Sequence, residues 1–330
     1  LESRGIWFRP HVWLSDEWFS PSGIPGLAIP FYLTHRTLMR LERTQMLEVE
    51  GGTRGQCMMI LRHEAGHAIQ HAYQIQRKRR WQAHFGRSST RYPGEYRPRP
   101  ASRQHVQHLA FWYAQSHPDE DFAETFAVWL TPGSRWRRKY LGWPALRKLR
   151  YVDQLMREIA GERPPIRSRA RPDPAHRIKT TLGDYYRARR ERYRVLASRA
   201  YDQDLLRFFT PIEESTSRSP AAASFLRSHR AEIRRMVARS TGKHELALDT
   251  VLGEMIARSR ELKLRAVGRQ KQLVIDFAIL LAARSAEFVY RRREPSNLWL
   301  EQFCFARSRQ RSCYGVDLSL IHISEPTRLD

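Results

Sequence analysis

The spacing of hydrophobic residues changes several times along the first part of the chain. From Trp7 to Leu33, aromatic and β-branched residues are interrupted by Pro and Gly, which predicts short strands and turns. Residues 34–46 and 57–76 instead carry apolar side chains every three or four positions, the spacing of amphipathic helices. Between them, residues 47–52 predict a strand and a turn. The chain thus opens with β-structure and continues into helix.

Beyond these helices the sequence becomes basic and irregular before helical spacing returns. Residues 77–104 scatter Gly and Pro among basic and aromatic residues, and we predict a long, mostly irregular insert there. Residues 102–115 predict a helix, and the next helix should begin at Ser116, a capping residue, with Pro118 in its first turn. We therefore expect residues 1–160 to form one α+β domain.

The second half of the chain has a different pattern. Residues 161–175 are rich in Pro and Arg and lack apolar periodicity, which is typical of a linker. Residues 176–293 follow helical spacing and predict an all-α domain. Residues 294–330 lose that spacing, and the stretch 319–330 resembles translated sequencing-adapter sequence, so we expect a non-native or disordered tail. The helices predicted in the second domain span residues 181–200, 220–240, 246–267 and 270–293.

Composition changes this picture mainly through charge. Lys and Arg together number 58 and Asp and Glu 34, which gives a formal net charge of +24 at pH 7. Such a surplus attracts nucleic acid or another polyanion but carries no information about the fold. Acidic residues interleave with the basic ones in the predicted helices, however, which favours salt-bridged, solvated helix faces.

Cysteine usage and the length of apolar runs bear on the compartment. Cys57, Cys304 and Cys313 are too few and too scattered for a disulfide framework or a four-thiolate zinc site, so we predict a reducing, cytoplasmic setting. The longest apolar run, residues 273–283, is far shorter than the roughly 20 residues that span a bilayer, and no membrane partner is expected. Because the chain opens on Leu1 rather than Met, we leave open a targeting segment upstream.

A metal-binding pattern lies within the helix predicted at 57–76. His63, Glu64 and His67 form the motif HExxH, and four residues of helix advance about 6 Å, which places both imidazoles on one face within reach of one zinc ion. Glu64 then falls beside the metal rather than on it, as suits a general base. His71 is about 12 Å along the axis from His63, so it cannot join the same site.

A zinc site of this kind requires a third protein ligand, and the helix after Ser116 offers two candidates. Glu120 and Glu124 stand four residues apart and share one helical face, as the two histidines do. One can bind the metal while the other orients a ligand through a hydrogen bond. A solvated acidic first turn accounts for Asp119 and Asp121. From the residues alone, the choice between Glu120 and Glu124 stays open.

Two segments together carry a family resemblance. The HEAGH segment at 63–67 and the SHPDEDFAETF segment at 116–126 resemble the putative zinc-binding metallopeptidase family, within the Glu-ligand zincins, or gluzincins. The resemblance runs from about residue 13 to 160 and implies a zincin-like domain with a short β-sheet and an active-site helix. It also implies Glu120 as the third zinc ligand, with Glu124 behind the ligands.

The same resemblance implies an activity. A zinc-dependent metallopeptidase would hydrolyse peptide bonds through a zinc-activated water, with Glu64 passing the proton of the water to the leaving amine. In the related lethal-factor type of zincin, a Tyr lies seven residues before the ligand. That position is Tyr113 here, a candidate to stabilise the oxyanion, although an aromatic core cluster also accounts for it.

The resemblance also bears on the substrate. An edge strand of the N-terminal β-region is expected to pair with an extended protein or peptide substrate. The basic insert at 77–103 would overhang the cleft and favour acidic substrates.

Two other functions fit parts of the sequence. A DNA-associated zinc protease of the SprT type would use the net charge of +24 as its binding surface, but it takes a third His, for which His105 and His108 are the candidates. A basic nucleic-acid-binding protein with an inactive zincin domain would retain the fold without the chemistry. Zinc content together with peptide hydrolysis distinguishes these alternatives.

Overall fold

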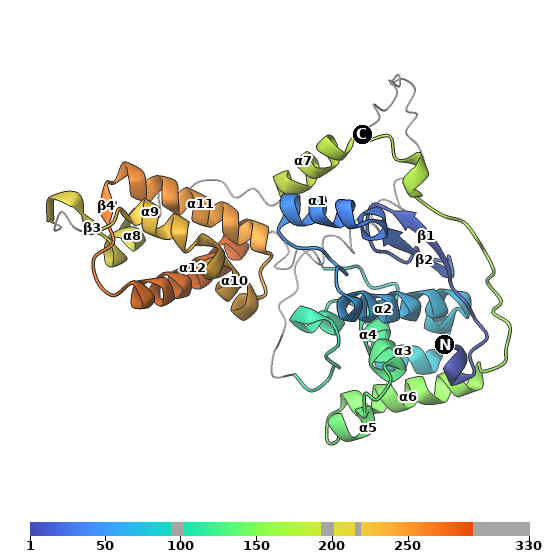
Figure 1. The fold of residues 1–330 in the computed structure, drawn as a ribbon. Helices are drawn as coiled ribbons and strands as arrows, with labels where there is room; N and C mark the ends of the chain where they lie inside the picture. The colour runs from blue at the N-terminus through green and yellow to red at the C-terminus, as the bar shows by residue number, and fades with distance from the viewer. Residues whose placement is uncertain (94–98, 100–101, 193–200, 215–218, 293–330) are drawn as a thin grey trace.

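The computed structural model describes residues 1–330 except 94–98, 100–101, 193–200, 215–218 and 293–330 (Figure 1). The described residues are mostly helical and contain two small two-stranded sheets, consistent with the predicted α+β class. The predicted tail at 294–330 lies outside them. Among the helices of the described part, none has the length and apolar character needed to cross a membrane.

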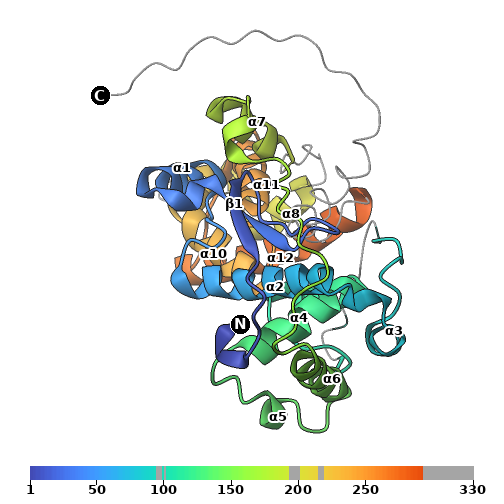
Figure 2. The same cartoon turned by 90° about the vertical axis from the view of Figure 1, so that its right-hand side faces the viewer.

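The N-terminal region predicted to be β-rich contains a parallel pair of strands. Strand β1 (His11–Ser15) runs beside β2 (Gly26–Pro30). In both views of the molecule this sheet lies on one side of helix α2 (Arg54–Ala72), and α4 (Pro118–Leu130) and α6 (Ala145–Glu158) lie on the other (Figures 1 and 2). Helix α2 is therefore enclosed between two layers.

Several helices of the first 160 residues pack around one large apolar cluster. Its members come mainly from the second half of α2 and from α4 and α6, and they include the fully buried Trp81, Phe122 and Phe126. The helical elements in this part are η1 (Glu2–Arg4), η2 (Phe31–Thr34), α1 (Arg36–Met46), α2 (Arg54–Ala72), η3 (Ile75–Arg77), α3 (Arg79–Phe85), η4 (Ala110–Gln115), α4 (Pro118–Leu130), α5 (Trp136–Lys139) and α6 (Ala145–Glu158).

The strand predicted at 47–52 is wrong. Leu47 ends α1 in the left-handed conformation, with φ of 67°. Gly51 also has a positive φ, and the N–H of Gly52 donates to the carbonyl of Val49 at 3.0 Å. A positive φ at both ends of so short a segment turns the chain and prevents extended pairing.

The helix predicted at 102–115 is only partly present. Residues 110–115 form η4, but residues 102–109 are not helical. The N–H groups of His108 and Leu109 instead donate to a carboxylate oxygen of Glu124, at 3.2 and 2.9 Å. A tertiary contact to a buried side chain therefore replaces helical hydrogen bonds here.

The cap of the next helix lies one residue later than predicted. Helix α4 starts at Pro118, and its cap is His117, whose Nδ1 accepts from the N–H of Asp119 at 3.1 Å. The hydroxyl of Ser116 donates to the carbonyl of Tyr113 and does not cap the helix. An imidazole nitrogen thus takes the role expected of the serine oxygen.

The segment predicted to be a linker, residues 161–175, is extended and docks on β1. Alternate side chains of β1 donate to main-chain carbonyls of this segment. The pairs are His11 Nε2 with the Ala170 oxygen at 2.9 Å, Trp13 Nε1 with the Pro172 oxygen at 2.9 Å, and Ser15 Oγ with the Asp173 oxygen at 2.6 Å. We call residues 161–175 the strap.

Helix α7 (Leu182–Arg192), which follows the strap, packs against α1. Nη1 of Arg189 lies 2.8 and 3.0 Å from the two carboxylate oxygens of Glu42, and both side chains are buried. Met46 and Tyr186 bury their side chains together beside this pair. The chain therefore returns to the first 160 residues after its predicted boundary at 160.

The remaining helices form a second apolar cluster that shares no residue with the first. Two predicted helices correspond to α11 and α12, and the helix predicted at 220–240 is divided near His229 into α9 and α10. The elements of this part are α8 (Asp202–Phe208), β3 (Thr210–Pro211), η7 (Ile212–Glu214), α9 (Ala222–Ser228), α10 (Arg230–Thr241), α11 (Glu245–Glu261), β4 (Leu264–Arg265) and α12 (Gln270–Arg292), whereas η5 (Ala175–Arg177) lies between the strap and α7. At the start of α11, the N–H of Glu245 donates to Glu48 at 2.9 Å, which joins the two parts.

Candidate metal centre

Helices α2 and α4 approach each other closely at one pair of small residues. Gly66 lies between the two histidines of HExxH, and Ala123 lies between Glu120 and Glu124. A methyl group on Gly66 would lie 2.9 Å from the Cα of Ala123 and 3.2 Å from its carbonyl oxygen. Only a residue without a side chain allows this approach. It brings the face of α2 that carries the two histidines against the face of α4 that carries the two glutamates.

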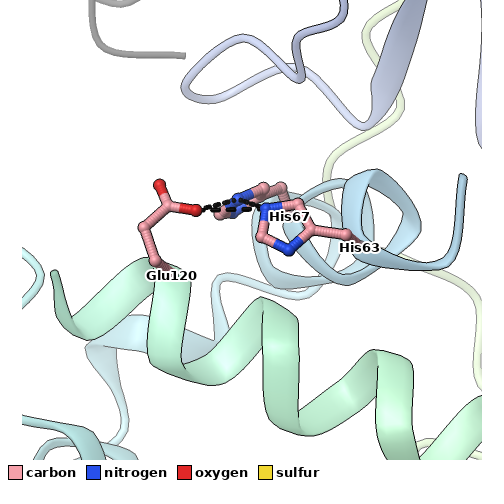
Figure 3. Close-up of side chains that lie close together, drawn as sticks. All are labelled: His63, His67 and Glu120. Atoms are coloured by element: carbon pink, nitrogen blue, oxygen red, sulfur yellow. Dashed lines mark hydrogen bonds and ion pairs between the residues drawn. The ribbon is translucent and has the colours of Figure 1, made fainter. Parts of the chain in front are cut away.

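The three side chains expected to bind metal meet at this crossing (Figure 3). Oε2 of Glu120 lies 3.1 Å from Nε2 of His63 and 3.0 Å from Nε2 of His67. The two imidazole Nε2 atoms lie 3.1 Å apart. One potential ligand atom from each residue thus points to a common centre, with all three atoms within 4.8 Å of one another.

Glu124 is placed behind the centre rather than in it. Its Oε1 accepts from Nδ1 of His63 at 2.9 Å, so the opposite ring nitrogen faces the centre. Its Oε2 accepts from the main-chain N–H groups of His108 and Leu109. A carboxylate held in this way fixes both the tautomer and the orientation of the imidazole.

The centre is buried and rich in negative charge. The residues His63, Glu64, Glu120 and Glu124 are each no more than 1% exposed. Burial alone would lower the pKa of His63, but hydrogen bonds to Glu120 and Glu124, together with their charges, raise this pKa to about 10. Buried carboxylates require compensating positive charge, so the arrangement favours a cation.

The donor set fits zinc. Two imidazole nitrogens and one carboxylate oxygen are the three protein ligands typical of catalytic zinc sites, which keep a fourth position open. Bond lengths of about 2.0 to 2.2 Å in a tetrahedral site separate ligand atoms by roughly 3.4 Å. The observed separations of 3.0 and 3.1 Å therefore need only a small outward adjustment.

The two residues predicted to act on substrate lie next to this centre. Glu64 follows His63 on α2 and is fully buried. The ring of Tyr113 is tilted against that of His63, with centroids 5.6 Å apart. Tyr113 also packs in an apolar cluster with Trp18 and Ile60, so it is both a neighbour of the centre and a core residue.

The other histidines lie outside the ligand cluster that the described residues form. His71 is buried at the end of α2. Nε2 of His108 donates to the carbonyl of Met59 at 3.0 Å, and burial lowers the pKa of this imidazole. His105 lies 3.8 Å from Asp121, and burial followed by the charge of Lys148 lowers its pKa to about 4.

Sequence reasoning missed two residues at the centre. The hydroxyl of Tyr92 donates to Oε1 of Glu120 at 2.8 Å. Its ring stacks on His117, whose Nε2 donates to the carbonyl of Thr90 at 2.8 Å. Tyr92 belongs to the irregular insert, where no periodicity marks a residue as buried or as a neighbour of the site. His117 was recognisable only from its position directly before Pro118.

Comparison with known proteins agrees with this geometry. Residues 41–132 match the model of the family described as putative zinc-binding metallo-peptidase. This match confirms the predicted resemblance to that family over residues 41–132, a range that includes both α2 and α4. The assignment to the gluzincins stays a prediction. The family is described as zinc-binding, and His63, His67 and Glu120 form a cluster able to hold such an ion. No curated protein and no solved structure matches the chain.

The close crossing at Gly66 leads to a prediction. We expect Gly66→Ala to destabilise the protein by about 1 to 3 kcal/mol and to weaken zinc binding, because its methyl group meets main-chain atoms of α4 that cannot move independently. Urea unfolding and chelator competition measure the two effects.

Gly55 provides a matched control on the same helix. A methyl group there meets nothing within 4 Å, so Gly55→Ala should stabilise the protein by about 0.5 to 1 kcal/mol through helix propensity. Equal effects of the two substitutions would show that the close approach of α2 and α4 is not required.

Proposed function

We propose that this protein is a zinc-dependent metallopeptidase whose centre is formed by His63, His67 and Glu120. The observation that carries the proposal is the convergence of these three side chains from two helices, with Glu124 orienting His63 from behind. The family match over residues 41–132 supports the same class of activity. Zinc bound at such a centre supplies Lewis acidity, which lowers the pKa of water to about 7 and polarises a carbonyl oxygen.

The remaining residues have separate tasks in this proposal. The carboxylate of Glu64 accepts a proton from the attacking water and returns it to the leaving amine, which is general base and then general acid catalysis. The hydroxyl of Tyr113 stabilises negative charge developing on the carbonyl oxygen of the substrate. His63 and His67 remain neutral when they bind metal, because a ligating imidazole must be deprotonated.

A zincin-like arrangement is part of the proposal. The two-stranded sheet lies on one side of α2, as that arrangement requires (Figure 1). Within the described residues, β2 is the one strand with which β1 pairs, and Val12 and Leu14 of β1 are 46% and 42% exposed. We propose β1 as the edge strand that pairs with an extended protein or peptide substrate.

The geometry disfavours a third histidine ligand of the SprT type. His105 and His108 contact Asp121 and the Met59 carbonyl, and neither belongs to the cluster around His63 and His67. A role in binding nucleic acid therefore rests on the net charge of +24 alone. No second function is proposed.

The division of labour between the two parts of the chain is also a proposal. We propose that the metal-binding unit includes the strap and α7, because both pack on β1 and α1. The cluster formed by α8 to α12 would then be the helical domain predicted within 176–293, without α7, which belongs to the metal-binding unit. Its proposed role is to bind substrate or partner rather than to take part in catalysis.

Purified full-length protein tests the proposed activity. We expect about one zinc per chain and cleavage of casein that is lost on chelation and restored by zinc. His67→Ala should lose both metal and activity, since it removes one of three protein ligands. The matched control is His176→Ala, which removes an exposed imidazole distant in sequence from the motif and should change neither quantity.

Two outcomes would contradict the proposal in different ways. If His67→Ala keeps its zinc, the metal is bound elsewhere on the chain. If the wild-type protein holds zinc at this centre but cleaves no peptide, the chain is a binding protein with an inactive zincin domain.

A further inference from the structure

The two oxygens of the Glu120 carboxylate have different surroundings. Oε2 faces the two histidines, at 3.1 Å from His63 and 3.0 Å from His67. Oε1 accepts a hydrogen bond from the hydroxyl of Tyr92 at 2.8 Å. The side chain of Glu120 is only 2% exposed, so this donor comes from the protein at a position that bulk water barely reaches.

Tyr92 is itself held in place by His117. Its ring stacks on the imidazole of His117 with centroids 3.7 Å apart and planes inclined by 10°. Nδ1 of His117 accepts from the N–H of Asp119, which fixes the ring to the first turn of α4. Nε2 donates to the carbonyl of Thr90, two residues before Tyr92. His117 thus connects the helix that carries Glu120 to the segment that carries Tyr92.

A hydrogen bond to one carboxylate oxygen restricts rotation of the whole group. With Oε1 bound to a fixed phenol, Glu120 presents Oε2 alone to the centre. The same principle governs ligating histidines, whose second nitrogen is fixed by an outer partner, as Glu124 fixes His63. The centre therefore has one such partner for an imidazole ligand and a second for the carboxylate ligand.

We propose that Tyr92 is a positioning residue that orients Glu120 for binding of the metal through a single oxygen. The inference rests on the proposed metal centre and deepens it by assigning a function to the insert between α3 and η4. In this role Tyr92 acts through Glu120.

Removal of the hydroxyl alone tests this role. Tyr92→Phe keeps the ring stacked on His117 but removes the donor, and we expect zinc affinity to fall about 10-fold to 100-fold, the range for loss of an outer partner. Competition with a chelator of known affinity measures it on the full chain. The control is Tyr73→Phe, which removes a hydroxyl that donates to the Glu162 carbonyl at 2.8 Å and should leave the affinity unchanged.

Two further measurements separate positioning from a general structural role. In protein loaded with Co²⁺ in place of zinc, Tyr92→Phe should shift the visible absorption bands, whereas Tyr73→Phe should not. In a Glu120→Ala background, Tyr92→Phe should cause no further loss of metal affinity, because the residue through which it acts is absent. His117→Asn keeps an acceptor for the cap of α4 but removes the ring beneath Tyr92, so it should also lower the affinity.

The possible results are distinct. The inference is overturned if Tyr92→Phe binds zinc within threefold of wild type, or if its effect is equally large without Glu120. If wild type binds zinc and Tyr92→Phe weakens it but no peptide is cleaved, the peptidase proposal fails and the role of Tyr92 stands. If wild type binds no zinc, both are wrong.

Discussion

Glu64→Gln should retain one zinc per chain and lose peptide hydrolysis by a factor of about 10² to 10⁴, the range typical of general base catalysis. The substitution keeps the shape of the side chain and removes only its ability to accept and return a proton. Glu64 is fully buried on α2 directly after the ligand His63, and it is not a member of the ligand cluster. Zinc content and initial rates on a peptide measure the two quantities in one preparation.

The matched control for Glu64→Gln is Glu158→Gln on α6. The Glu158 side chain is 43% exposed and forms a surface ion pair with Arg80, so its loss should leave both zinc and hydrolysis unchanged. Loss of zinc in Glu64→Gln would contradict its assignment as base, because it would make Glu64 a ligand. Unchanged hydrolysis would exclude it from the reaction altogether.

Glu120→Ala and Glu124→Ala should have opposite rankings in two measurements. We expect Glu120→Ala to weaken zinc binding more, since it removes a ligand atom, whereas loss of an outer partner costs about 10-fold to 100-fold. Glu124→Ala should reduce the stability of the metal-free protein more. Glu124 accepts from the N–H groups of His108 and Leu109, and each buried donor left without an acceptor costs about 1 to 3 kcal/mol.

Because the two variants are expected to rank in opposite order for zinc affinity and for stability, general damage to the fold cannot explain both results. Chelator competition ranks the variants by affinity, and urea unfolding of the metal-free proteins ranks them by stability. If Glu124→Ala is worse in both measurements, the metal ligand is Glu124, and the geometry around Glu120 needs another explanation. If Glu120→Ala is worse in both, the hydrogen bonds to Glu124 contribute little to stability.

The part of the centre built on helical repeats could be predicted from the sequence. His63 and His67 are four residues apart in one helix, and Glu120 and Glu124 are four apart in another, so each pair had to share a face. The sequence did not reveal how closely the helices cross. The distance between α2 and α4 depends on the contact between Gly66 and Ala123. No sequence pattern indicates that these two positions meet.

Tyr92 and His117 could not be predicted for a related reason. Tyr92 lies outside any helix or strand, and His117 lies at the cap of α4, whereas hydrophobic periodicity carries information only within regular elements. The prediction of a helix at 102–115 was wrong for residues 102–109. There the buried carboxylate of Glu124 accepts from main-chain N–H groups that would otherwise donate within a helix.

Composition also failed to distinguish a free linker from a docked one. A Pro- and Arg-rich sequence without periodicity is expected for both, and the strap is docked by residues of β1 that lie about 160 positions earlier in the chain. Likewise, the helical spacing of α7 correctly predicted a helix. It could not identify α1 as the element on which that helix packs.

The manner in which β1 holds the strap has a consequence for sequence variation. His11, Trp13 and Ser15 bind carbonyl oxygens, which every residue type supplies, so these hydrogen bonds do not themselves select the side chains of the strap. Arg169 and Arg171 are exposed beside these contacts, so we expect docking to survive their substitution. The two partners of this contact therefore tolerate mutation unequally: substitutions can accumulate in the strap, while the three donors of β1 must be retained.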